Sequence, residues 1–600
     1  MSKFKKIKKV IFKDVKVRYY FYFVLLLLNV ATTMFSSYST KALIDCLTNE
    51  PFAEMDILEK AYFYLFGGHE LLSNNVWAFA IIIIGFALIS VGLAISRFLL
   101  RSYTITKMGK NLQDELFYHI ERLPYPVIKS LPNGDLIQTC TKDESTVLRY
   151  FTFQRYMIVH TIFLVSTSFI ILSITNYQIA LVSLSLLPFM FIYSFFIIKE
   201  VRRRYRLTDD SEGEMTSKIE ENLSSVRLVK AFNNERFEIT EFEKYIDDYQ
   251  GKFIRWKKLS SFFYGSSDIF VFAQIALTSV FGFYLCFIHY VNNDPMGISV
   301  GTLAISFTFV NMIVWPVRDV ATIISNFAQA LAAADRINLI FDEPLEDIDS
   351  GVTPTLDGTI EFKNVGFKFA DSSIDNLSNL SFKIKPGQTV AIMGKTGSGK
   401  STLSYLLARL YDNTSGEILL NDVNIKEIKR THLRENVSIV LQEPFLFSKT
   451  IEDNIKLVTT NASETDILEA TKTSFIHDSI LKFKDGYRTA VGEKGVTLSG
   501  GQKQRLSIAR TLVKKSPIII FDDSLSAVDT DTDFKIREAL KARKNKSTML
   551  IITHRVATAK DADLIIVLND GTIEALGTHD ELIKKKGLYK RVNDIQTKME

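Results

Sequence analysis

The sequence predicts a multi-domain protein in which a six-helix α-helical transmembrane domain is followed by an α/β domain. Apolar runs crowd the first 325 residues or so of the 600-residue chain. Beyond about residue 359, short apolar segments alternate with amphipathic helical patterns, which is typical of an α/β domain. One short segment leads into a glycine-rich turn followed by a helical pattern.

Composition also favours two parts of different kinds. Hydrophobic residues make up 47% of the chain, yet 23% of its residues are charged, a mixture unusual for a purely soluble or a purely intramembrane protein. The net charge of +5 is small for this length and implies no nucleic-acid partner. Cys46, Cys140 and Cys286 lie far apart without metal-ligand spacing, so neither a disulfide framework nor a cysteine zinc site is suggested.

Six segments are long and apolar enough to cross a membrane, because a hydrocarbon layer of roughly 30 Å requires about 20 helical residues. The segments between the second and third spans, and between the fourth and fifth, are charged and rich in helix formers, so they predict helices prolonged beyond the bilayer. Residues 1–18 read as a basic interfacial segment before a retained first span, since no small-residue cleavage site follows. The spans are predicted at 19–43, 76–100, 157–175, 177–198, 262–289 and 298–324.

The distribution of basic residues predicts the orientation of these spans. Lys and Arg are retained on the cytoplasmic side, and they are abundant in segments 1–18, 101–155 and 199–258. The connection between the first two spans contains only Lys60, and residues 291–297 contain no basic residue. We therefore predict a multi-pass protein of the cell membrane, with both termini and the α/β domain in the cytoplasm.

Few charged residues fall within the predicted spans, and most of these lie near the ends of the helices. We interpret them as structural or hydrated groups, because a proton or ion relay would need a chain of acidic residues. They are Lys41, Arg97, Asp268, Arg318 and Asp319.

The glycine-rich turn has the context of a P-loop, the phosphate-binding turn between a strand and a helix. Glycines allow successive backbone N–H groups to face phosphate oxygens at the positive end of the following helix. Lys400 would neutralise β and γ oxygens, and the Ser401 hydroxyl would bind Mg²⁺. The α/β domain is therefore predicted to be a P-loop nucleotide-binding domain. Its turn consists of Gly394, Lys395, Thr396, Gly397, Ser398, Gly399, Lys400, Ser401 and Thr402.

A second apolar strand pattern, residues 518–521, ends in two carboxylates. Parallel strands in such a sheet present their final residues at the phosphate-binding edge. We predict that Asp522 holds Mg²⁺ through water and that Asp523 orients or deprotonates the attacking water.

The segment Leu498, Ser499, Gly500, Gly501 and Gln502 resembles the signature motif of ATP-binding cassette (ABC) transporters. In order and spacing, Phe369 matches the aromatic residue that stacks on adenine, Gln442 the Q-loop glutamine and His554 the switch histidine. The resemblance places Gln442 among both the catalytic and the metal-binding residues. Residues 526–529 match the D-loop, and segments 131–136, 221–222 and 229–232 resemble those flanking the coupling helices of exporters.

The resemblance covers essentially the whole chain and implies how it works. It implies ATP and Mg²⁺ as cofactors and a dimer in which each signature motif caps the ATP held by the opposite cassette. The membrane domain is expected at residues 1–340, a linker at 341–358 and the cassette at 359–600. The chain would then be one half of an exporter.

Asp523 departs from the family pattern, because most members have Glu at this position. A base withdrawn by one methylene, about 1 Å, can lower the rate on the order of 100-fold. With Asp at this position, the chain most resembles heterodimeric bacterial exporters, in which one ATP site hydrolyses poorly and the other is active. The retained His554 leaves a slow homodimer as the alternative.

The predicted cargo is amphipathic or hydrophobic, of the multidrug type, because the spans offer many apolar and aromatic residues and little fixed charge. Export of a lipid or a peptide is an alternative. A membrane sensor that is gated by ATP and carries no cargo is another. Six spans argue against a soluble DNA-repair ATPase.

Overall fold

The computed structural model describes residues 2–292, 296–459, 461–492, 495–525, 528–542 and 547–598. Two compact units are present: Met1–Glu121 with Leu131–Glu343, and Arg122–Ser130 with Pro344–Glu600. The expected boundary at residue 340 had placed Arg122–Ser130 in the membrane domain, whereas this segment packs with the second unit. The reason is aromatic contact, because the Tyr125 ring lies 5.6 Å from the Tyr411 ring.

The first unit is a helical membrane unit. Among the described residues, six helices are long and apolar enough to cross a membrane, and the first five contain their predicted spans. The sixth span was predicted at 298–324, whereas its helix runs only from Val300 to Arg318 and a separate helix begins at Val320. They are α2 (Lys16–Leu47), α5 (Val76–Glu121), Asn133–Thr175, Tyr177–Ser224, α13 (Glu235–Asn292) and α14 (Val300–Arg318). Asn133–Thr175 consists of α7 (Asn133–Gln138), η2 (Thr139–Asp143), α8 (Glu144–Arg149), η3 (Tyr150–Gln154) and α9 (Arg155–Thr175), and Tyr177–Ser224 contains α10 (Tyr177–Leu184) and α11 (Leu187–Ser224). The remaining elements of the unit are η1 (Ser2–Phe4), α1 (Lys5–Ile11), α3 (Ile57–Leu65), α4 (His69–Asn74), α12 (Val226–Ala231) and α15 (Val320–Asp342).

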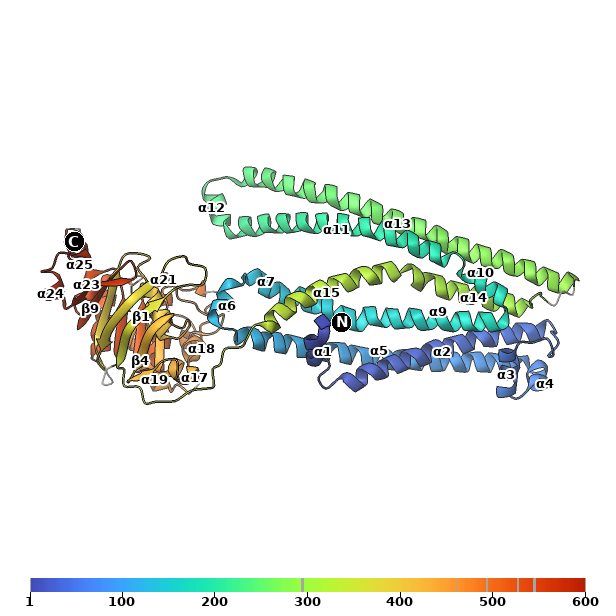
Figure 1. Ribbon diagram of the computed structural model, residues 1–600, viewed down its shortest axis with the longest axis horizontal. Coiled ribbons are helices and arrows are strands. Elements are labelled where there is room, and N and C mark those ends of the chain that lie inside the picture. Colours follow the sequence, from blue (N-terminus) through green and yellow to red (C-terminus); the bar gives the residue numbers. More distant parts are fainter. Residues whose placement is uncertain are drawn as a thin grey trace. The chain divides into compact units, whose positions relative to one another are not determined.

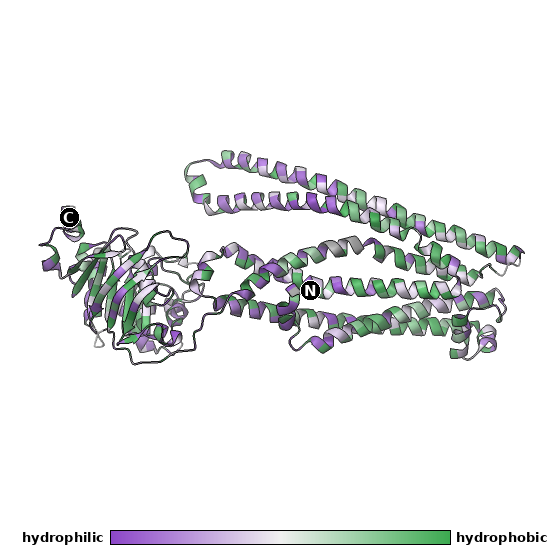
Figure 2. Ribbon diagram, in the orientation of Figure 1, coloured by the Kyte–Doolittle hydropathy of each residue, from purple (hydrophilic) through white to green (hydrophobic). Residues whose placement is uncertain are grey.

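Several of these helices continue well beyond a bilayer, as the sequence predicted. The 58 residues of α13 correspond to about 87 Å of helix, nearly three times the hydrocarbon thickness. Figure 2 shows α11 and α13 changing from hydrophobic to hydrophilic toward the short helix α12 that connects them. The two helices run side by side as a hairpin (Figure 1).

The fourth span is interrupted, although the sequence predicted one continuous helix over residues 177–198. Helix α10 ends at Leu184 and α11 begins at Leu187, with Pro188 in its first turn. The buried Gln274 side chain of α13 satisfies the break: it accepts the Leu186 N–H at 2.9 Å and donates to the Val182 carbonyl at 2.7 Å. Such pairing is required because irregular backbone at membrane depth has no water to bond with.

Two groups of charged residues in the spans form ion pairs, around Arg318 and around Lys41. Helix α14 ends at Arg318, whose guanidinium lies 2.5 Å from the Asp268 carboxylate of α13. Lys41 is only 2% exposed and is surrounded by carboxylates, so it is buried rather than hydrated.

The second unit contains two sheets (Figure 1). One has four antiparallel strands in the order β2-β1-β4-β5, and the other has six strands in the order β10-β9-β3-β8-β7-β6, all parallel except β10. The strands are β1 (Ile360–Phe367), β2 (Leu377–Ile384), β3 (Thr389–Gly394), β4 (Ser415–Leu420), β5 (Val423–Asn424), β6 (Val437–Val440), β7 (Ile518–Asp522), β8 (Thr548–Ile552), β9 (Leu564–Asn569) and β10 (Thr572–Gly577).

Helices cover the central strands, which are fully buried along β7 and β8. This burial explains why both strands read as continuous apolar runs in the sequence. The helical elements are α6 (Tyr125–Ser130), α16 (Lys400–Leu407), α17 (Arg430–Asn436), α18 (Ile451–Lys456), α19 (Glu464–Thr473), α20 (His477–Leu481), η4 (Gly486–Arg488), α21 (Gly500–Val513), α22 (Thr530–Lys541), α23 (Val556–Ala559), α24 (His579–Leu582) and α25 (Leu588–Thr597).

Candidate nucleotide-binding site

The candidate site lies at the carboxyl edge of the parallel strands. Ile392 of β3 and Asp522 of β7 both pair with Ile552 of β8, so the ends of these three strands meet. Strand β6 pairs with β7 through Val440 and Phe521, and Gln442 follows two residues later as an exposed side chain. The carboxyl edge of an open parallel sheet is where ligands bind in such folds.

The glycines of the turn between β3 and α16 are required by its backbone. Gly397 and Gly399 have positive φ angles of 83° and 93°, which other residues rarely adopt. A Cβ atom at Gly399 would lie 2.4 Å from the Leu377 side chain, whereas at Gly397 nothing lies within 4 Å. The turn is therefore packed tightly against β2 at Gly399, whereas the space beside Gly397 is open.

Lys400 is held over this turn without a carboxylate partner. Its ammonium donates to the carbonyls of Gly394 at 2.9 Å and Lys395 at 2.6 Å. No carboxylate lies within ion-pair distance of it among the residues that the structure describes. Burial lowers the pKa of Lys400, and the charges of Asp523 and Asp522 oppose this shift. The ammonium is thus available to an anionic ligand.

Two hydroxyls and one carboxylate converge beneath the turn. The Ser401 hydroxyl donates to Asp522 Oδ1 at 3.0 Å, and the Ser404 hydroxyl donates to Asp522 Oδ2 at 3.4 Å. Burial raises the pKa of Asp522, while these two hydrogen bonds act in the opposite direction. Hard oxygen ligands of this kind suit Mg²⁺.

Asp523 and His554 form a second pair at the same edge. Asp523 has a φ of 48°, and its N–H bonds to the Ile552 carbonyl at 3.1 Å. Its Oδ1 lies 3.2 Å from His554 Nδ1. The left-handed backbone therefore directs the carboxylate toward the end of β8.

Phe369, the expected adenine contact, lies in an aromatic cluster. Its ring meets Phe367 and Tyr411 edge-on, with centroids 4.8 and 5.2 Å apart. The ammonium of Lys129, from α6, lies 5.1 Å from its ring centroid. One face of Phe369 is consequently occupied by a cation–π contact.

The signature residues begin α21. The Ser499 hydroxyl accepts the Gln502 N–H at 3.3 Å, and the Gln502 side chain accepts the Ser499 N–H at 2.9 Å. This reciprocal capping box fixes the start of the helix. Ser499 and Gly500 are exposed, and nothing lies within 4 Å of a Cβ built on Gly500. The helix N-terminus is therefore accessible to an anion.

The structure describes most of the remaining residues that the sequence predicted for the site. Ser526 and Ala527 of the expected D-loop lie outside the described residues, while Asp529 caps α22 through the Thr532 N–H at 2.9 Å. Lys395 and Thr396 are exposed, and Thr402 is buried.

Sequence reasoning missed Ser404 and Lys129. Ser404 could have been found, because it lies one helical turn after Ser401 and faces the same side. Lys129 comes from a segment far away in the sequence, and no local pattern marks it.

The site fits a nucleotide triphosphate and Mg²⁺. Ser398 is 2% exposed, and its hydroxyl has no hydrogen-bond partner among the described residues. Together with the open space beside Gly397 and the available Lys400 ammonium, this matches a phosphate cradle. The fold and the site therefore define a membrane-embedded P-loop nucleotide-binding protein.

Comparison with known proteins identifies the family. The family model described as ABC transporter transmembrane region matches residues 19–317, and the model described as ABC transporter matches residues 377–526. The chain is 32% identical to the Bacillus subtilis ABC transporter ATP-binding protein YknU, over 81% of this chain and 82% of that protein. It is 31% identical to an ATP-dependent lipid A-core flippase of Haemophilus influenzae, over 82% of this chain and 83% of that protein.

The fold is also similar to that of a bacterial Atm1-family ABC exporter with ATP bound. The TM-score is 0.80 at 25% identity, covering 97% of this chain and 98% of that one. The chain belongs to the ABC transporter family, as the resemblance implied, and has the architecture of an exporter-type half-transporter. It is a multi-pass membrane protein whose second unit is an ATP-binding domain with ATPase activity coupled to transport.

Proposed function

We propose that the chain is one subunit of a dimeric exporter that moves amphipathic or hydrophobic small molecules, of the multidrug type, across the cytoplasmic membrane. One observation carries this proposal: a single chain combines an apolar membrane unit with a P-loop site. In that site the Lys400 ammonium contacts backbone carbonyls and no carboxylate of the described residues. Both termini and the ATP-binding domain would lie in the cytoplasm, as the basic segments favour.

Two exposed surfaces support a dimer. The N-terminus of α21 presents Ser499 and Gly500 to solvent, where they could cap the ATP of an opposite cassette. Around α12, Leu223, Leu228 and Phe232 are between 59 and 75% exposed, although they lie at the hydrophilic end of the α11–α13 hairpin. Exposed apolar residues grouped in this way favour an interaction with another chain.

The chain's own residues have distinct tasks in hydrolysis. Lys400 would bind the β and γ phosphates, and the backbone N–H groups of the turn would orient them. Ser401, Gln442 and Asp522 would hold Mg²⁺, which neutralises phosphate charge when it is bound. Asp523 would align the attacking water, with His554 beside it at 3.2 Å.

Asp523 would make this chain's own site the weaker of two. Its carboxylate is one methylene shorter than Glu, and the contact with His554 draws it toward β8. In a heterodimer, Ser499 of this chain would complete the active site on the partner's P-loop. We favour this arrangement over a homodimer with two slow sites.

Two substitutions in the purified dimer test the assignment. Asp523→Glu should leave ATPase activity unchanged or raise it, because the longer side chain returns the base toward the water. Ser499→Ala should lower the activity at least about 10-fold, since it removes a hydroxyl from the productive site. The measurement is steady-state ATP hydrolysis at saturating ATP.

Ser463→Ala is a matched control for Ser499→Ala, because Ser463 caps α19 with the same reciprocal geometry away from the signature. It should leave turnover unchanged. The assignment is wrong if Asp523→Glu lowers activity while Ser499→Ala spares it.

Lipid export is a second candidate. A cavity of about 210 Å³ in the membrane unit is lined by Phe191, Phe195 and Ile198, together with Lys199 and Arg202. Apolar rings beside two cations suit a molecule with an acyl part and an anionic headgroup. The similarity to a lipid A-core flippase favours the same class.

Transport into vesicles distinguishes these functions. The dimer, reconstituted with its ATP-binding domains outward, should accumulate a hydrophobic fluorescent dye in the presence of ATP. ATP-dependent translocation of an anionic fluorescent lipid, without dye uptake, would select the lipid exporter. ATP hydrolysis without movement of either probe would favour the sensor. The Ser499→Ala dimer is the control for leakage.

A further inference from the structure

A polar cavity lies in the membrane unit where α2 and α13 end and α14 begins. Its volume is about 750 Å³, and its lining combines residues from α2, the connection that follows α2, and the end of α13. Five carboxylates and one lysine line this cavity: Asp45, Glu50, Glu54, Asp56, Glu59 and Lys41. Acidic side chains therefore outnumber lysines in the described lining of this cavity.

Lys41 already forms ion pairs with three of these five carboxylates. The Lys41 ammonium lies 3.0 Å from the Asp45 carboxylate and 3.2 Å from that of Asp56, and it also pairs with Glu59. It makes no ion pair with Glu50 or Glu54. The second oxygen of Glu59 is buried, and it has no hydrogen-bond partner among the described residues. A buried carboxylate oxygen of this kind requires a cation or a donor.

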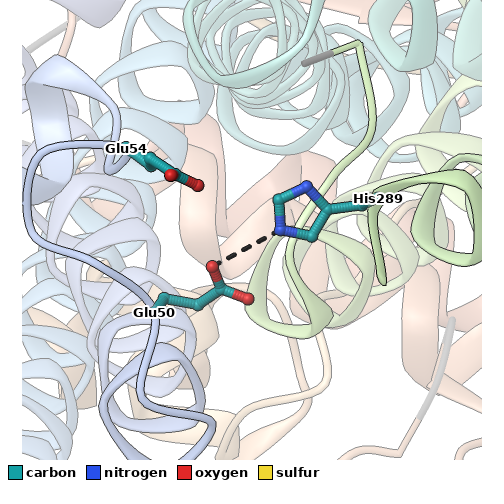
Figure 3. A group of neighbouring side chains, drawn as sticks. All are labelled: Glu50, Glu54 and His289. Atoms are coloured by element: carbon teal, nitrogen blue, oxygen red, sulfur yellow. Dashed lines mark ion pairs between the residues drawn. The ribbon is translucent and has the colours of Figure 1, made fainter. Parts of the chain in front are cut away.

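Glu50, Glu54 and His289 converge on one space within this cavity (Figure 3). One ligand atom from each lies within 4.8 Å of the others. The His289 Nε2 atom is 3.5 Å from the Glu50 carboxylate, whose other oxygen accepts a hydrogen bond from the Tyr290 hydroxyl. Glu50 is only 8% exposed at its side chain, so its orientation is fixed by packing.

We propose that Glu50, Glu54 and His289 form a binding site for a divalent transition-metal cation of the Zn²⁺ type. Imidazole with carboxylates suits such ions, whereas Mg²⁺ and Ca²⁺ prefer oxygen ligands throughout. Ligand atoms around one Zn²⁺ stand about 3.4 Å apart, given bonds near 2.1 Å. The present separations are wider than this, so the exposed Glu54 side chain would turn inward to close the set. Water would complete the coordination.

A cation at this site would join two spans. Glu50 follows α2, and His289 lies in the last turn of α13, so the ion would fix the end of the first span to the end of the fifth. Spans that must rearrange during transport would be held in the present arrangement while the ion is bound. The site goes beyond the proposed export function and does not depend on which side of the membrane this end faces.

The test is Zn²⁺ binding to the full-length, tag-free protein in lipid nanodiscs, measured by competition with a fluorescent chelator. The wild type should bind one Zn²⁺ per chain at this site. Glu54→Gln and His289→Asn should each weaken that binding by about 10- to 100-fold or more. Glu70→Gln and His69→Asn, in helix α4 of the same connection, are the matched controls and should bind like the wild type.

Thermal melting provides the second measurement. Zn²⁺ should raise the melting temperature of the wild type and of both controls, a chelator should reverse the shift, and neither ligand variant should respond. If His289→Asn fails to fold, the Zn²⁺ affinity of the Glu54→Gln variant still tests the proposal, because Glu54 is exposed. Equal Zn²⁺ affinity in Glu54→Gln and the wild type overturns the proposal. Displacement of Zn²⁺ by an equal concentration of Mg²⁺ or Ca²⁺ also overturns it.

Discussion

Each unit contains a lysine whose ammonium is held by neighbouring oxygen atoms, but these atoms are carboxylate oxygens in the membrane unit and backbone carbonyl oxygens in the ATP-binding unit. In the membrane unit, Lys41 is 2% exposed and its ammonium is surrounded by Asp45, Asp56 and Glu59. In the ATP-binding unit, the Lys400 ammonium contacts only backbone carbonyls of its own turn among the described residues. Carbonyl oxygens carry partial charges, so they hold the ammonium in place and leave most of its charge available.

This difference in partners indicates that Lys41 belongs to a structural ion cluster and that Lys400 belongs to a ligand site. A lysine saturated by carboxylates stabilises its surroundings, because removing it leaves uncompensated buried charges. A lysine kept away from carboxylates contributes little to the fold and strongly attracts an anion. Substitution of each lysine should therefore affect stability in one unit and ligand binding in the other.

Lys41→Met is expected to have the largest effect. It leaves the buried carboxylates of Asp45 and Glu59, and the partly buried carboxylate of Asp56, without a cation. Loss of one partner of a buried ion pair costs roughly 3–5 kcal/mol. We expect a much lower yield of folded protein and a lower melting temperature in detergent. Lys60→Met is the control, since the Lys60 ammonium bonds to the Ala53 carbonyl at the surface.

The double variant Lys41→Met with Glu59→Gln should recover part of the loss, because it removes one of the uncompensated charges. A single Lys41→Met variant as stable as the wild type would contradict the structural role of this cluster.

Lys400→Ala should affect binding and leave the fold intact. A hydrogen bond to a charged group contributes about 1.5–3 kcal/mol, so ATP affinity at this chain's site should fall about 10- to 100-fold. Part of the turnover should remain if the partner's P-loop carries most of the hydrolysis. Binding of a fluorescent ATP analogue and thermal melting measure the two quantities. Lys385→Ala, at an exposed lysine before β3, should change neither.

A loss of melting temperature in Lys400→Ala comparable to that of Lys41→Met would remove the distinction between the two lysines.

Local sequence patterns mark the candidate ATP site more clearly than the ion clusters. The glycine-rich turn follows β3, and Asp522 and Asp523 stand at the end of the buried strand β7, where short patterns predicted them. The partners of Lys41 could not be found in the same way, since Asp56 and Glu59 follow a connection whose path only packing decides.

The membrane unit shows the same limit. Its six spans were evident from apolar length, but the break between α10 and α11 was not. That break depends on Gln274, which lies on a different helix and supplies both missing hydrogen bonds. Similarly, α6 packs with the ATP-binding unit because of ring contacts that no local pattern encodes.

A third lysine, Lys129, is expected to have the smallest effect. Its ammonium covers one face of Phe369, and such a contact contributes about 0.5–1 kcal/mol. If adenine stacks on that face, Lys129→Met should tighten ATP binding by about 2- to 5-fold, because no contact has to be displaced. Tripolyphosphate lacks the base, so its affinity should stay unchanged, and Lys368→Met should alter neither. Weaker ATP binding in Lys129→Met would instead mean that this lysine stays beside the nucleotide and stabilises it.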